Sequence, residues 1–202
     1  MTNIKGILFD LGGVLVRLNG WPINPSWLAQ PMEDQCFWPQ WLAMPCLDAY
    51  HRGQISSQDF AKQVIANWQL NCSPEDLLSW FTAWPDSLLP DALQLVQQVR
   101  PGVHKAIFSN INEAHWPLVQ AFGLLPLFDQ AFGSHLCQLA KPDPAFYLYA
   151  CAQMKLPPSQ VLLLDDTLIN IETAIGLGMH AKQVQGTQEA RAALLEHGLL
   201  DS

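Results

Sequence analysis

Residues 4–15 of the chain read IKGILFDLGGVL, and this stretch decides the fold. Ile4–Phe9 is a short apolar run, interrupted by Lys5, that ends at Asp10 shortly before the pair Gly12 and Gly13. A short apolar run bounded by turn signals is typical of a buried strand that leads into a tight loop. The stretch therefore predicts a core strand with a carboxylate at its carboxyl end.

Four more apolar runs follow much later in the chain, and helical patterns separate them. The runs cover 105–108, 130–133, 161–164 and 179–184, and helices are expected over 91–99, 113–122, 145–154, 168–177 and 188–197. Asp143 and Pro144 have the form of an N-cap and a first turn, while Gly178 and Gly198 end the last two helices. Strands that alternate with helices predict an α/β fold with a Rossmann-like, doubly wound parallel sheet.

Residues 17–85 break this rhythm. They contain seven of the eight tryptophans and no expected strand, while 56–68 and 73–84 begin like capped helices. We predict a small α-helical insert over 17–85, placed after the first strand of a core made of 1–16 and 86–202. The tryptophans are expected to form the core of this insert rather than platforms that stack on sugars.

The composition argues against several classes of protein. Hydrophobic residues make up 50% of the 202 residues and charged residues 14%, unlike a disordered chain. The net charge of −8, with 10 lysines and arginines in all, argues against nucleic-acid binding, and no apolar run approaches the length of a membrane span. Five cysteines without metal-ligand spacing, and no cleavable signal layout, predict a soluble cytoplasmic protein with reduced thiols. The oligomeric state stays open.

Polar side chains lie where the predicted strands end. Open α/β sheets bind ligands beyond the carboxyl ends of their strands. The first, second and fourth strands are followed directly by polar residues, and a loop after the third carries a lysine. Together they would place one set of groups at one rim of the sheet: Asp10, Ser109, Asn110, Lys141, Asp165 and Asp166.

This set suits the transfer of a phosphoryl group to a carboxylate. Asp10 is expected to attack phosphorus and form an aspartyl phosphate. Its charge would repel a phosphate dianion, so a cation has to intervene, and Asp10, Asp165 and Asp166 supply the hard oxygen ligands that Mg²⁺ prefers. Lys141 adds a positive charge, and Ser109 adds a hydrogen bond to a phosphate oxygen. The sequence thus predicts a Mg²⁺-dependent hydrolase of a small phosphorylated metabolite.

Four segments resemble, in order, the motifs of the haloacid dehalogenase-like hydrolase superfamily: FDLGGVL at 9–15, IFSN at 107–110, AKPDP at 140–144 and LLLDD at 162–166. The resemblance implies that the insert is the small helical cap of the subclass with a cap in that position. It also implies the role of each site residue. The nucleophile is Asp10, the phosphate ligands are Ser109, Asn110 and Lys141, and the Mg²⁺ ligands are Asp10, the Gly12 carbonyl, Asp165 and Asp166.

The sequence departs from the family pattern at Gly12. Most phosphatases of the superfamily have an aspartate there as general acid and base, and losing such help typically costs about 10²–10⁴ in rate. The glycine is also a candidate for a position that requires its backbone freedom. We expect a preference for sugar-1-phosphates, acyl phosphates and aryl phosphates over primary alkyl phosphates such as glycerol phosphate, because their leaving groups depart as anions more readily than a simple alkanol does. His51 and His115 are expected to be structural rather than replacements for the missing acid.

Two segments, HRGQIS at 51–56 and SNINEAH at 109–115, resemble more narrowly the bacterial α-glucose-1-phosphatase branch, which suggests a sugar phosphate as substrate. Two alternatives stay open. A dehalogenase would use Asp10 on carbon without a metal, which leaves the pair Asp165 and Asp166 unexplained. A phosphate-binding or regulatory protein with little turnover would explain Gly12 but not the retained Lys141.

Overall fold

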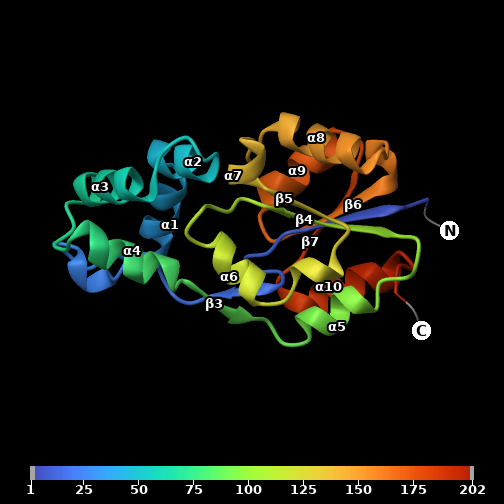
Figure 1. Ribbon diagram of the computed structural model, residues 1–202, viewed down its shortest axis with the longest axis horizontal. Helices are drawn as coiled ribbons and strands as arrows, with labels where there is room; N and C mark the ends of the chain where they lie inside the picture. The colour runs from blue at the N-terminus through green and yellow to red at the C-terminus, as the bar shows by residue number, and fades with distance from the viewer. Residues whose placement is uncertain (1–2, 201–202) are drawn as a thin grey trace.

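The centre of the molecule is a five-stranded parallel sheet, seen in a computed structural model that describes residues 3–200 (Figure 1). The strand order is β5–β4–β1–β6–β7. β1 pairs with β4 on one side and β6 on the other, with Gly6 opposite His104 and Val161. The expected α/β, Rossmann-like sheet is confirmed. Its strands are β1 (Gly6–Phe9), β4 (His104–Ser109), β5 (Gln130–Gly133), β6 (Val161–Asp165) and β7 (His180–Gln183).

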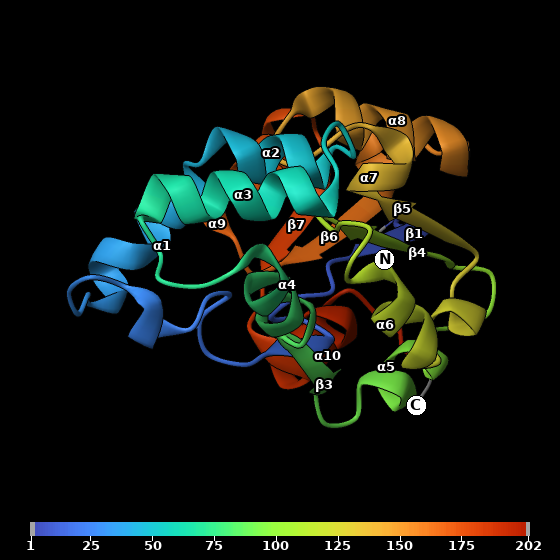
Figure 2. The same cartoon turned by 60° about the vertical axis from the view of Figure 1, so that its left-hand side comes forward.

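Helices cover both faces of the sheet because successive side chains of each buried strand point to opposite faces. In β1, Ile7 and Phe9 pack into one core and Leu8 into the other. The first core is covered by α5 (Ala92–Gln97), α6 (Trp116–Ala121) and α10 (Gly186–Glu196), and the second by α7 (Ser134–Cys137), α8 (Pro144–Met154) and α9 (Leu168–Gly176) (Figures 1 and 2). The five expected helices of this part are present, and Asp143 caps α8 by accepting a 3.0 Å bond from the Ala145 N–H. Short 3₁₀ turns η2 (Leu125–Leu127) and η3 (Pro158–Gln160) complete the connections.

Residues 19–84 form a helical lobe that stands beyond the carboxyl ends of the strands (Figure 1). Its elements are η1 (Pro25–Trp27), α1 (Asp34–Leu42), α2 (Pro45–His51), α3 (Ser57–Trp68) and α4 (Pro74–Thr82). Ser56 and Ser73 cap α3 and α4 as expected. The lobe has a hydrophobic core of its own that includes Phe37, Trp41 and Phe60. That it acts as a separate cap domain over 17–85 stays a prediction.

A two-stranded antiparallel ribbon joins the lobe to the sheet. It pairs β2 (Val16–Leu18) with β3 (Pro85–Leu88), and an ion pair of 2.9 Å links Arg17 to Asp86. The expectation that 17–85 contains no strand is therefore wrong at both ends of that range. The chain leaves the core and returns to it at the same place, so the two crossings run side by side and satisfy each other's backbone groups.

The two segments that suggested the narrower resemblance lie on facing sides of the junction between lobe and core. Ser57 at the start of α3 donates through its backbone N–H (2.8 Å) and its hydroxyl (2.5 Å) to the Glu113 carboxylate. Arg52 lies 3.6 Å from Asp143 at the start of α8. The loop after β4 and the start of α8 thereby both contact the lobe.

None of the helices within residues 3–200 is long and apolar enough to cross a membrane. All five cysteines lie in this part of the chain, and none of them forms a disulfide. The cytoplasmic location stays a prediction.

Candidate active site

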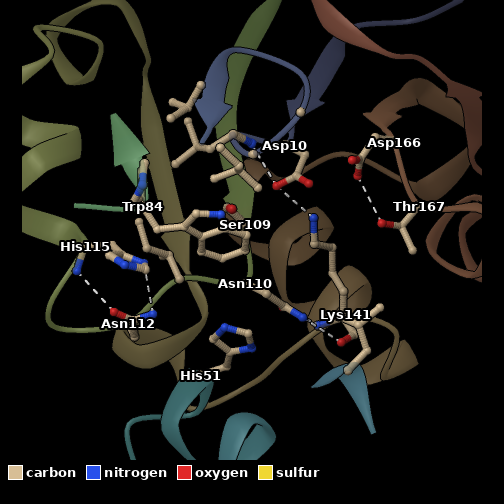
Figure 3. A pocket seen from close by; sticks show the side chains of 18 of the residues that line it. Asp10, His51, Trp84, Ser109, Asn110, Asn112, His115, Lys141, Asp166 and Thr167 are labelled. Atoms are coloured by element: carbon tan, nitrogen blue, oxygen red, sulfur yellow. Dashed lines mark hydrogen bonds and ion pairs between the residues drawn. The ribbon is translucent and has the colours of Figure 1, made fainter. Parts of the chain in front are cut away.

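The structure brings all the polar residues expected at the strand ends together (Figure 3). Asp10 follows β1, and its backbone N–H bonds to the Leu164 carbonyl of β6 at 2.9 Å. Ser109 ends β4, Asp165 ends β6, and Lys141 reaches in from the loop between α7 and α8. Parallel strands that end at one edge of the sheet therefore place groups more than 150 positions apart in sequence beside one another.

A buried ammonium group joins two of the carboxylates. Lys141 Nζ lies 3.0 Å from Asp10 Oδ1 and 2.6 Å from Asp165 Oδ2. Burial raises the pKa of Asp10 to about 7 even though Lys141 opposes the shift. Burial alone would lower the pKa of Lys141, but the carboxylates of Asp10 and Asp165 outweigh it and hold that pKa above its usual range. The lysine therefore stays charged in a place where water is scarce.

Asp165 is held by three donors. Its Oδ2 accepts from Lys141, and its Oδ1 accepts from the Thr167 N–H and the Asn170 side-chain amide, both at 2.9 Å. A fully buried carboxylate that accepts three hydrogen bonds is a fixed anchor for its ammonium partner. Sequence reasoning missed Asn170 and Thr167. The signal was Asn170, a polar residue on the face of α9 that also carries the buried apolar residues Ile171 and Ala174.

Three carboxylates face one another across the site. Ligand oxygens of Asp10, Asp165 and Asp166 all lie within 4.8 Å of one another, with one ammonium group among them. Burial and the charge of Asp165 raise the pKa of Asp166, whose Oδ1 accepts a 3.0 Å bond from the Thr167 hydroxyl. Oxygen donors that outnumber the positive charges fit a hard divalent cation such as Mg²⁺.

Asn110 fixes the loop that carries the lysine. Its side-chain N–H donates to the Lys141 carbonyl and its side-chain oxygen accepts from the Lys141 N–H, both at 2.8 Å. The amide therefore acts on the backbone of Lys141, a contact that the sequence did not predict. The Ser109 hydroxyl lies next to Asp10 and partly offsets the rise in the pKa of that carboxyl.

Gly12 and Gly13, in the loop after β1, differ in whether a side chain could replace the glycine hydrogen. Gly13 has a φ of +71°, and a Cβ there would lie 2.4 Å from Asp166 Oδ2. Gly12 lies outside the left-handed region, and a Cβ there would lie 3.1 Å from the tip of the Leu18 side chain. Gly12, a candidate for this requirement on the sequence, therefore does not need the backbone freedom of glycine, and the requirement falls on Gly13.

Gly13→Ala is expected to destabilise the protein and to displace Asp166. The positive φ alone costs about 1–2 kcal/mol for a residue with a Cβ. The matched control is Gly102→Ala, because Gly102 has a φ of +85° and nothing within 4 Å of the added atom. Urea unfolding should show a larger loss for Gly13→Ala than for Gly102→Ala, and Mg²⁺ affinity should fall only in the former. Equal losses would contradict the clash with Asp166.

His115 is structural, as expected. Its Nε2 donates to the Phe81 carbonyl at 2.7 Å, so its Nδ1 accepts from the Asn112 side-chain amide at 3.2 Å, and the ring stacks on Phe81. Burial lowers the pKa of His115 to about 4, which keeps the ring neutral. His51 lies in α2, and its ring faces the site (Figure 3); burial lowers its pKa to about 4 as well. Thus His115 ties the lobe to the core, whereas His51 faces the site.

A cavity of about 850 Å³ extends from the carboxylates to the lobe. Its floor consists of the strand-end residues, and its far wall comes from the helical lobe. Most tryptophans of the lobe pack in its core as expected, but three also line this cavity. The lobe wall consists mainly of Trp38, Trp41, Leu42, Leu47, Phe81 and Trp84.

Comparison with known proteins yields one family match and several relatives. Residues 4–178 match the family model described as haloacid dehalogenase-like hydrolase. The chain is 23% identical to the D-ribitol-5-phosphate phosphatase of Bacteroides thetaiotaomicron, over 95% of this chain and 97% of that protein. Two other curated relatives are much longer, and the chain spans only 33% and 18% of their lengths.

Solved structures share the fold. One is the HAD family enzyme bt-2542 of Bacteroides thetaiotaomicron in complex with magnesium and inorganic phosphate, with a TM-score of 0.73 and 20% identity over 90% of this chain and 94% of that one. Another is the L-2-haloacid dehalogenase of Xanthobacter autotrophicus with chloropropionic acid covalently bound, with a TM-score of 0.66 and 21% identity over 98% of this chain and 85% of that one. Both likenesses concern the fold alone.

Proposed function

The chain belongs to the haloacid dehalogenase-like hydrolase family, and from this premise we propose that it is a Mg²⁺-dependent phosphatase that uses Asp10 as nucleophile. The observation that carries the proposal is the buried set Asp10–Lys141–Asp165 with Asp166 beside it. A relative that acts as a D-ribitol-5-phosphate phosphatase, and a similar structure that binds magnesium and phosphate, support the same chemistry. The substrate is a small phosphorylated metabolite.

The residues divide the work of phosphoryl transfer. A carboxylate oxygen of Asp10 attacks phosphorus, the P–O bond to the alcohol breaks, and water then cleaves the aspartyl phosphate to release inorganic phosphate. Lys141, anchored by Asp165 at 2.6 Å, holds Asp10 in place and offsets the charge of the phosphate. Ser109 donates a hydrogen bond to the transferred group. This division makes Asp165 a positioning residue.

Asp10, the Gly12 carbonyl and Asp166 would hold Mg²⁺. When bound, the cation neutralises charge on the phosphate and lets two anions approach each other. That Asp165 is a ligand too stays a prediction, and the three donors on its carboxylate favour the task of holding Lys141. The helical lobe would close this site from water as a cap.

The alternatives explain less of the site. A dehalogenase attacks carbon and has no use for a cluster of three carboxylates, which would repel a haloacid anion. A phosphate-binding protein without turnover has no use for a nucleophile held 3.0 Å from a buried lysine. Hydrolysis of acetyl phosphate with and without Mg²⁺ separates the three, since only the proposed phosphatase turns it over in a metal-dependent way.

Asp166→Ala is expected to abolish Mg²⁺-dependent hydrolysis while the fold is kept. The Asp166 side chain is partly exposed and lines the cavity. Its removal leaves no unpaired buried charge, because the ammonium group of Lys141 keeps its ion pairs with Asp10 and Asp165. Steady-state rates at several Mg²⁺ concentrations measure the loss. Glu172→Ala, which removes an exposed carboxylate from the same segment, serves as the control and should behave like the wild type. Full activity of Asp166→Ala would rule out the metal assignment.

A further inference from the structure

The cavity that receives the substrate has walls of two kinds. Its floor holds the carboxylates and the lysine, where a phosphate group would lie. The part that would receive the alcohol is enclosed by the helical lobe, where apolar side chains predominate. They include three tryptophans, a phenylalanine and two leucines: Trp38, Trp41, Leu42, Leu47, Phe81 and Trp84.

Most polar groups of this outer part already have partners within the protein. The amide of Asn112 bonds to the ring of His115. The Trp84 N–H donates to the Gly20 carbonyl at 3.0 Å, and Asp48 is paired with Arg52 at 3.0 Å. A polyol placed here would bury several hydroxyls without partners, and each would weaken binding by about tenfold. The ring of His51 is one polar group that faces the space without such a partner among the described residues.

The mouth of the cavity carries exposed side chains of both kinds, and its charged ones, Arg17 and Asp48, are paired with Asp86 and Arg52. Three large side chains that line it are exposed to solvent: Leu18 by 36%, Leu42 by 67% and Ile169 by 52%. They come from three parts of the chain: the ribbon, the lobe and the core. Exposed apolar side chains gathered at one opening mark a binding surface for an apolar group.

We propose that the substrate is the phosphomonoester of a hydrocarbon alcohol, with an alkyl, alkenyl or aryl group, rather than a sugar or polyol phosphate. This inference rests on the proposed function, because the phosphate is placed at Asp10 and the hydrocarbon follows from that placement. Water hydrolyses the ester, the P–O bond to the alcohol breaks, and a hydrocarbon alcohol and inorganic phosphate leave. The apolar walls would contribute affinity in proportion to the apolar area that they cover.

A series of primary phosphates tests the proposal with Mg²⁺ present. Butyl, hexyl and octyl phosphate share one kind of leaving group with glycerol 3-phosphate and ribitol 5-phosphate. We expect kcat/KM to rise about fourfold per added methylene until the cavity is filled. Octyl phosphate should exceed both polyol phosphates by at least about a hundredfold. A flat series, or faster hydrolysis of the polyol phosphates, would overturn the proposal.

Substitutions at the mouth of the cavity test where the hydrocarbon binds. Leu42→Ser and Ile169→Ser should reduce the increase in kcat/KM per added methylene. Leu195→Ser, which changes a leucine that is 59% exposed on α10 outside the cavity, should keep it. If kcat/KM still rises by the same factor per methylene in Leu42→Ser and Ile169→Ser, the hydrocarbon binds elsewhere and the proposal is wrong.

A binding measurement separates this proposal from the proposed function. If the wild type fails to hydrolyse acetyl phosphate with Mg²⁺, the phosphatase assignment is wrong. Calorimetric titration with butyl-, hexyl- and octylphosphonate, which need no turnover, then decides the substrate class. Affinity that increases with chain length supports the apolar cavity, and affinity independent of chain length contradicts it.

Discussion

Asp10→Asn is expected to lower turnover of phosphomonoesters by at least about 10⁴-fold, the order of loss seen when a covalent nucleophile is removed. An amide is a poor nucleophile and cannot form the acyl phosphate. The substitution keeps the shape of a side chain whose Oδ1 accepts from the Leu11 N–H at 2.7 Å and from Lys141 at 3.0 Å. Single-turnover kinetics would measure the loss. Crystals of the wild type grown with beryllium fluoride should show the adduct on Asp10.

The control for this substitution is Asp59→Asn, which removes an exposed carboxylate from the first turn of α3, outside the cavity. It should retain wild-type turnover. A fluoride adduct on any other residue, or substantial turnover by Asp10→Asn, would defeat the nucleophile assignment.

The same variant should be more stable than the wild type in metal-free buffer, and the difference should depend on pH. Burial raises the pKa of Asp10 from 3.8 to about 7. Below pH 3.8 the carboxyl is protonated in both the folded and the unfolded state. Between 3.8 and about 7 the unfolded state loses its proton first, so stability falls as pH rises. The gap in melting temperature between Asp10→Asn and the wild type should therefore widen from pH 5 to pH 8.

The sheet and the site were predictable because one physical rule joins them. An apolar run has to be buried, and the parallel strands that result end at one edge of the sheet. Asp10 after β1, Ser109 at the end of β4 and Asp165 at the end of β6 follow from this rule. The β2–β3 ribbon could not be predicted from this rule. Val16–Leu18 and Pro85–Leu88 are only three and four residues long, too short for a pattern to identify them as strands. They pair because the chain leaves the core and returns to it at the same place.

The contacts that orient the site residues could not be predicted in the same way. The hydrogen bonds of Asn110 to the backbone of Lys141 depend on where a loop some thirty residues later passes. The contact of Asn170 with Asp165 depends on the rotation of α9 about its axis. Tryptophans of the lobe were expected in a hydrophobic core, and Trp41 is there, yet it also borders the cavity. Composition does not distinguish a core wall from a cavity wall.

Gly12→Asp is expected to raise kcat/KM for phosphate esters of simple alcohols by about 10²–10⁴, the usual contribution of a general acid. In the wild type no carboxylate at this position protonates the departing oxygen, so an alcohol that leaves poorly as an anion reacts slowly. The backbone of Gly12 lies outside the left-handed region, and the atom nearest to an added Cβ is the end of the flexible Leu18 side chain, 3.1 Å away. A Cβ therefore fits at this position after a small shift of that leucine.

Phenyl phosphate and benzyl phosphate give the sharpest measurement, because they are similar in shape and apolar but release a phenol and an alcohol. The wild type should strongly prefer phenyl phosphate, and Gly12→Asp should narrow that preference, since the added acid matters most for the poorer leaving group. Gly12→Asn is the matched control: it adds the same bulk without a transferable proton and should keep the preference of the wild type. Equal wild-type rates on both esters, with chemistry shown to be limiting by single-turnover kinetics, would mean that another group donates the proton. His51 would then be the first residue to replace, because its ring faces the cavity beside Lys141 (Figure 3).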